Sequence, residues 1–163
     1  MRITDEAALI ANLRARLEDL NDYRFSDDEW KRFFEASIRT PGDGVIEKTR
    51  RVQEGHVQSL IRDNGETKNI SLIDKQNVHR NSLQVINQYE ATTASRSNRY
   101  DVTILVNGLP LVHIELKRRG VAIRDAFNQI SRYQRDSFWA GAGLFGYVQV
   151  FVISNGTDTK YYS

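Results

Sequence analysis

The N-terminal part of the chain carries apolar residues at the spacing of a helix. Residues 4–21 place these apolar side chains on one helical face: Ala8, Leu9, Leu13, Leu17 and Leu20. Thr4 is the expected N-cap of this helix. A capping box from Ser26 to Glu29 predicts a second helix to about Ser37, which the sequence PGDG at 41–44 then breaks.

In the middle of the chain the pattern changes to the alternation that is typical of strands. A short helix is expected over residues 45–54, and the small, polar stretch 91–99 is expected to be a loop. Strands are expected over 56–61, 68–73 and 82–89. The turn signal Asn64-Gly65 joins the first two of them.

The C-terminal part has the strongest pattern. Apolar strands at about 101–106 and 110–116 flank a second turn signal, Asn107-Gly108, and an amphipathic helix over about 122–138 follows. The stretch 147–154 is almost continuously apolar, which predicts a strand buried on both faces. A further short strand is expected at 159–162.

This order predicts an α/β fold of α+β character, a mixed sheet flanked by helices, in a single domain over residues 1–163. Residues 1–44 form its helical part and residues 45–163 its mixed-sheet core. Because the sequence stops within a predicted strand, we expect it to be a fragment of a longer protein.

Composition excludes several classes of protein. The chain has no cysteine, so it has neither a disulfide framework nor a thiolate metal site. It has no signal peptide pattern and no apolar run long enough to span a membrane, so the cytoplasm is the expected compartment. A net charge of +2 is too balanced to indicate nucleic-acid binding by itself.

Candidate chemistry lies on the strands around Asn107-Gly108. Glu115 and Lys117 are two residues apart and project from the same face of a strand. A carboxylate there could bind Mg²⁺ while the ammonium lies near a water or a phosphate, and Asp101 on the neighbouring strand is the candidate second carboxylate. The Glu-x-Lys spacing alone also fits a solvated strand face.

The position of Asp101 depends on the loop. A simple two-residue turn would set Asp101 opposite Ile114, whereas a three-residue loop or one bulge would put Asp101 and Glu115 on the same face. A magnesium site therefore requires an odd-length loop or a bulge, and Pro110, which lacks a backbone N–H, makes this plausible.

Other polar residues surround this candidate centre. Gln129 and Tyr133 share a helix face and could reach the strand ends or DNA, although a half-buried tyrosine beside a surface glutamine gives the same pattern. Arginines could contact phosphates or be ordinary surface charge: Arg96, Arg99, Arg118, Arg119, Arg124, Arg132 and Arg135. A second basic group, Lys48, Arg50 and Arg51, is expected to be solvated. His113 shares the face of Glu115, and we interpret it as structural.

These residues resemble a known signature. Asp101, Glu115-Leu116-Lys117 and Gln129 to Tyr133 resemble the PD-(D/E)xK nuclease motif with a downstream QxxxY motif. The stretch 80–163 is similar to the N-terminal endonuclease domain of the R subunit (HsdR) of type I restriction enzymes. Tyr100 stands where the motif has proline.

The resemblance implies a restriction-endonuclease-like fold and a type I site-specific deoxyribonuclease. Asp101 and Glu115 would be catalytic residues and Mg²⁺ ligands, Lys117 the catalytic lysine, and Gln129, Tyr133, Arg118 and Arg119 supporting or DNA-binding residues.

The resemblance also implies a larger assembly. ATP would act only in motor domains outside this chain, and the partners would be double-stranded DNA and the modification and specificity subunits, with no membrane. Because neither Glu6 nor Glu18 matches the glutamate of the family's N-terminal helix, we expect that helix to be missing. Alternatives are a RecB-like exonuclease or repair nuclease, a catalytically silent DNA-binding or assembly domain, and a structural α/β domain.

Overall fold

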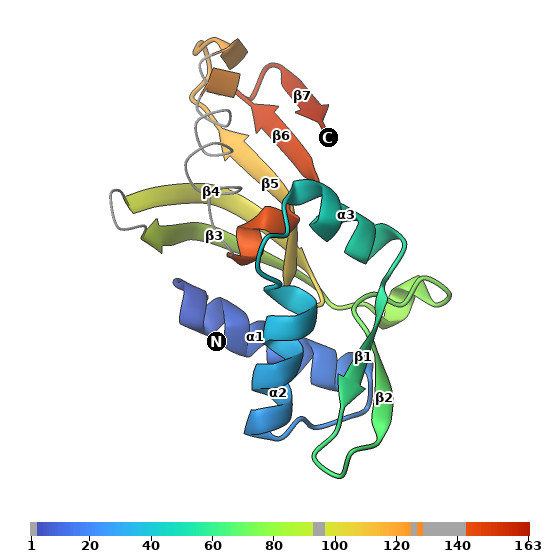
Figure 1. The fold of residues 1–163 in the computed structure, drawn as a ribbon. Coiled ribbons are helices and arrows are strands. Elements are labelled where there is room, and N and C mark those ends of the chain that lie inside the picture. Colours follow the sequence, from blue (N-terminus) through green and yellow to red (C-terminus); the bar gives the residue numbers. More distant parts are fainter. Residues whose placement is uncertain (1–2, 93–96, 125–126, 129–142) are drawn as a thin grey trace.

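A computed structural model describes residues 3–92, 97–124, 127–128 and 143–163. The α-helices are α1 (Glu6–Leu20), α2 (Asp27–Phe33) and α3 (Val45–Gln53). There is also a short π-helix, η1 (Phe34–Ile38), and two short 3₁₀ helices, η2 (Val78–Arg80) and η4 (Leu144–Tyr147). The strands are β1 (Val57–Ile61), β2 (Thr67–Ser71), β3 (Leu83–Thr92), β4 (Ser97–Val106), β5 (Leu109–Leu116), β6 (Val150–Ser154) and β7 (Thr159–Tyr162). Helices and a mixed sheet confirm the predicted α/β class (Figure 1).

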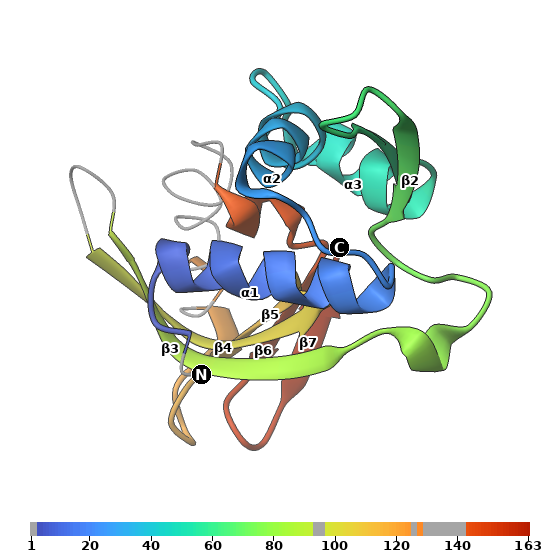
Figure 2. The same ribbon diagram turned by 90° about the horizontal axis from the view of Figure 1, so that it is seen from below.

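The strands form two sheets. β1 and β2 pair in a small antiparallel hairpin, and the larger sheet has the order β3-β4-β5-β6-β7. Within the larger sheet β5 and β6 are parallel and the other neighbours are antiparallel. In Figure 2, α1 lies between this sheet and a second group made of α2, α3 and the β1–β2 hairpin.

The core forms where α1 packs against the sheet. Leu9, Leu13 and Leu17 of α1 are fully buried, and so is Leu105 of the sheet. These side chains belong to one hydrophobic cluster that also includes Ile70 of the small hairpin. A single core therefore joins both sheets, and burial of its apolar surface is the main force that stabilises the fold.

The caps of the first two helices follow from local chemistry, with one correction. The cap of α1 is Asp5, whose carboxylate accepts a hydrogen bond from the Ala8 backbone N–H, and the expected cap, Thr4, is wrong. The Ser26–Glu29 capping box is confirmed, because each side chain accepts the other residue's backbone N–H.

Glu29 does more than cap α2. Its buried carboxylate also accepts hydrogen bonds from the Tyr23 hydroxyl (2.8 Å) and the Asp63 backbone N–H (3.1 Å). Burial alone would raise the pKa of Glu29, but the bonds from Tyr23, Ser26 and Asp63 outweigh it and lower the pKa below 4.5. The ionised carboxylate therefore fastens α2 to the loop between β1 and β2.

Replacing Glu29 by glutamine should lower the free energy of unfolding by about 2 kcal/mol at pH 7, because the amide loses charge-assisted bonds. The pKa of Glu29 is lower in the folded state than in the unfolded state, so this stabilisation is complete at a pH above the unfolded-state pKa. It is lost as the pH falls through the folded-state pKa. Urea unfolding of the wild type and Glu29→Gln from pH 7 to pH 3 should show the two curves converging. The exposed Glu35→Gln is the control, and a difference that grows on acidification would contradict this account.

Several sequence-based boundaries need correction. Residues 91–92 and 97–99 belong to β3 and β4, so the connecting loop is shorter than expected, because strand pairing extends into this polar stretch. β6 begins only at Val150, after the turn η4. Its residues alternate between buried and half-buried, so the prediction of burial on both faces is wrong.

Of the second basic group, Arg50 is exposed as expected, but Lys48 and Arg51 are not solvated. Lys48 is buried, and its Nζ donates to the Gly143 carbonyl (3.3 Å). Arg51 pairs with Asp43 and donates to the Tyr147 hydroxyl. Lys48 and Arg51 instead join α3 to η4, and burial lowers the pKa of Lys48.

Of the predicted helix over about 122–138, the structure describes Ala122, which is not helical, and Ile123, Arg124, Phe127 and Asn128, which are. Within the part of the chain that is described, no helix has the length and apolar character needed to cross a membrane.

Candidate active site

The site begins at the turn between β4 and β5. Asn107 and Gly108 have φ angles of 50° and 84°, the positive values that a two-residue hairpin turn requires. The Asn107 side chain accepts from the Ser82 backbone N–H (2.8 Å) and donates to the Leu72 carbonyl (3.0 Å). The turn is thus anchored to the segment that leads into β3.

A bulge follows this turn and corrects the register. Val106 and Leu105 pair with Leu109 and Pro110, as a two-residue turn dictates, but Ile104 pairs with Val112. Leu111 is therefore the extra residue of the bulge, next to a proline that has no backbone N–H to donate. The required bulge is confirmed, although the loop itself has the shorter, two-residue length.

The shifted register brings Asp101 beside Glu115. The pairing continues to Val102 and Ile114, and the next residues along the two strands are Asp101 and Glu115. Asp101 Oδ2 accepts a hydrogen bond from the backbone N–H of Leu116 (2.9 Å). The Asp101 carboxylate is therefore held by the backbone N–H of the residue that follows Glu115.

Glu115 is buried and is held from two sides along β5. Lys117 Nζ donates to Glu115 Oε1 (2.9 Å), and His113 Nε2 lies 3.5 Å from Glu115 Oε2. Burial alone would raise the pKa of Glu115, but His113 and Lys117 outweigh it and hold the pKa below its usual value. Glu115 is consequently ionised at neutral pH.

This arrangement fits a hard divalent cation. Mg²⁺ is usually bound by one or two carboxylates together with water and substrate oxygens. One carboxylate oxygen of Asp101 accepts the hydrogen bond from the Leu116 N–H. Oε2 of Glu115 is buried and makes no hydrogen bond among the described residues, although His113 lies 3.5 Å from it. No group of three or more potential metal ligands occurs in the described ranges, so any cation here would depend on this carboxylate pair.

The other predicted site residues fall into two groups. Arg118 and Arg119 follow Lys117 and are exposed, where they could meet a phosphate backbone. Gln129 and Tyr133 lie outside the described residues, as do Arg132 and Arg135.

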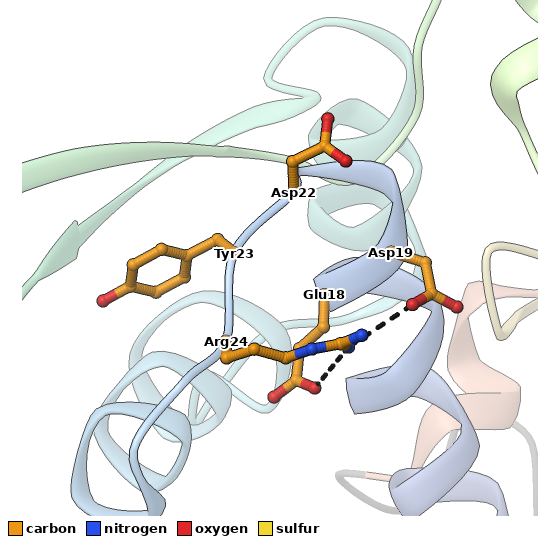
Figure 3. A pocket seen from close by; sticks show the side chains of 5 residues that line it. All are labelled: Glu18, Asp19, Asp22, Tyr23 and Arg24. Carbon is orange, nitrogen blue, oxygen red and sulfur yellow. Dashed lines mark hydrogen bonds and ion pairs between the residues drawn. The ribbon is translucent and has the colours of Figure 1, made fainter.

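A surface pocket at the end of α1 is unrelated to this centre. It is lined by Glu18, Asp19, Asp22, Tyr23 and Arg24 (Figure 3). Arg24 bridges the carboxylates of Glu18 (3.0 Å) and Asp19 (3.3 Å), and Asp22 pairs with Arg80. Its acidic charge is thus matched by the chain's own arginines.

Comparison with known proteins shows which family the chain belongs to. The family model "Type I restriction enzyme R protein N terminus" matches residues 1–163. The chain is 52% identical over 161 residues to the type I restriction enzyme EcoprrI endonuclease subunit of Escherichia coli, covering 99% of this chain and 51% of that protein. It is 39% identical over 166 residues to the type I restriction enzyme SsaAORF53P endonuclease subunit of Staphylococcus saprophyticus, covering 99% of this chain and 17% of that protein.

A more distant relative is archaeal. The putative type I restriction enzyme MjaIXP endonuclease subunit of Methanocaldococcus jannaschii is 32% identical over 112 residues, covering 64% of this chain and 10% of that protein. The chain thus spans about half the length of the Escherichia coli relative and under a fifth of the staphylococcal one. Since the family model matches the whole sequence, the chain belongs to the family of type I restriction enzyme R protein N-terminal regions.

Proposed function

We propose that this chain is the Mg²⁺-dependent DNA endonuclease domain of an ATP-dependent type I restriction R subunit, and that it cleaves unmodified foreign DNA. The observation that carries the proposal is the bulged β4–β5 hairpin. It fixes Asp101 on the Leu116 peptide, directly beside a buried Glu115 that is paired with Lys117.

The carboxylates are the proposed metal ligands. Asp101 and Glu115 would hold Mg²⁺, which when bound activates water and offsets the negative charge of the phosphoryl group. Glu115 is ionised without a metal, so it need not lose a proton before binding. The Asp101–Leu116 hydrogen bond keeps the first carboxylate at the end of the β4–β5 pairing and so limits the rearrangement that binding requires.

Lys117 has a different role. Its side chain is 22% exposed, whereas that of Glu115 is 2% exposed, so the ammonium lies on the solvent side of the carboxylate. From there it can turn toward the attacking water or the scissile phosphate, while Arg118 and Arg119 bind neighbouring phosphates. Sequence recognition would come from the specificity subunit and modification from its partner subunit.

Asp101→Ala and Lys117→Ala test this proposal in the complete R subunit, assembled with its partner subunits. Each should lower cleavage of supercoiled plasmid by roughly 10²–10⁴-fold, because each removes a group that acts on the reacting phosphate. ATPase activity should be retained, since ATP would be hydrolysed in the motor domains. Full cleavage by both variants would instead indicate a catalytically silent DNA-binding or assembly domain.

A further inference from the structure

His113 lies next to the proposed metal ligand. It precedes Glu115 by two residues on β5, so both side chains leave the same face of the strand. Its Nε2 lies 3.5 Å from Glu115 Oε2, while Lys117 Nζ bonds the other oxygen, Oε1, at 2.9 Å. The two oxygens of Glu115 thus have separate neighbours along one strand.

The two neighbours differ in freedom of movement. The His113 side chain is 0% exposed, and its ring contacts those of Tyr100 (5.4 Å between centroids) and Phe151 (6.4 Å). Both rings meet the imidazole edge-to-face, which restricts its rotation. Lys117, by contrast, is long and partly solvated. Of the two side chains beside Glu115, His113 is therefore held more rigidly than Lys117.

The aromatic support extends beyond these two rings. Tyr100 stacks on Tyr89, and both rings contact Phe145 of η4. The imidazole is therefore supported by three strands, β3, β4 and β6, and by the turn that precedes β6.

We propose that His113 is a positioning residue for the Glu115 carboxylate. Its contact keeps the carboxylate in the same orientation when the Lys117 ammonium moves away from it. This inference rests on the proposed function, because it assigns His113 a role only if Glu115 binds the metal. When Lys117 turns toward the phosphate, Oε1 becomes available to the cation while the imidazole of His113 stays in contact with Oε2. Groups that orient a metal ligand in this way typically contribute tenfold to a hundredfold to metal affinity.

Binding of Mn²⁺, which prefers the same oxygen ligands as Mg²⁺, tests the inference directly. Free Mn²⁺ is measured by its electron paramagnetic resonance signal as the 163-residue chain is titrated. His113→Leu should raise the Kd at least about tenfold, because the leucine fills the space but makes no polar contact. His113→Gln should restore the Kd to within about threefold of the wild-type value, since its amide can place a donor toward Oε2.

Two further variants separate the possible outcomes. Leu105→Ala destabilises the same sheet at its pair with Pro110, far along the hairpin from Glu115, and should leave the Kd unchanged. Glu115→Ala should abolish specific binding. If Glu115→Ala binds as the wild type does, the proposed metal site itself is wrong. If Glu115→Ala fails to bind but His113→Leu binds normally, or His113→Gln gives no rescue, only the role of His113 is refuted.

Discussion

Replacing Glu115 by glutamine should lower DNA cleavage by the complete R subunit about 10³-fold. A neutral amide is a poor ligand for a hard cation, and loss of the metal's stabilisation of the transition state costs several kcal/mol. Each 1.4 kcal/mol corresponds to a factor of ten in rate. The substitution also removes the negative charge that pairs with Lys117, whose partly exposed ammonium can be hydrated instead, so the fold should survive. Initial rates of plasmid cleavage measure the effect.

Glu35→Gln is the matched control, since it makes the same chemical change at an exposed position on η1. It should cleave at the wild-type rate. Circular dichroism should give the same spectrum for both variants. Cleavage by Glu115→Gln within about threefold of the wild type would show that this carboxylate is not a ligand that the reaction requires.

Gly108→Ala should lower the free energy of unfolding by about 3 kcal/mol. Gly108 has a φ of 84°, where an alanine is strained by about 1 kcal/mol. Its added Cβ would also lie 2.6 Å from Leu13 Cα and 3.0 Å from Leu13 N, both backbone atoms of α1. Helix α1 would have to move away from the hairpin, at a further cost of about 2 kcal/mol. Urea unfolding at pH 7 provides the measurement.

Gly65→Ala isolates the first of these costs, that of the backbone conformation. Gly65 belongs to another Asn-Gly turn and has nearly the same φ, 83°, but its Cβ would meet nothing within 4 Å. This variant should lose only about 1 kcal/mol, the cost of the backbone conformation alone. Equal losses in the two variants would mean that close contact between α1 and the β4–β5 turn does not contribute to stability.

Local sequence signals explain much of the fold. The Ser26 capping box and the Asn107-Gly108 turn are short-range chemistry, and both occur where the sequence places them. The need for a bulge also followed from strand alternation, because Asp101 could not otherwise lie opposite Glu115. Its position at Leu111 did not follow, since bulges depend on how both strands and β6 pair.

Residues that gain their role from distant parts of the chain could not be identified in this way. Lys48 appeared solvated because its neighbours in sequence are charged, but η4, far along the chain, buries it. His113 lay on the expected face, yet its ring contacts come from β4 and β6. Only its two-residue spacing from Glu115 could have suggested the contact between them.

The central claim is that Asp101 and Glu115 share one divalent cation. Crystals of the chain grown with Mn²⁺ test it through the anomalous scattering of the metal. The account predicts a peak within about 2.0–2.3 Å of one carboxylate oxygen from each residue, with Lys117 Nζ moved away from Glu115 Oε1. The contradicting result is bound Mn²⁺ that contacts neither carboxylate, while Asp101 keeps its hydrogen bond from the Leu116 N–H and Lys117 keeps its hydrogen bond to Glu115.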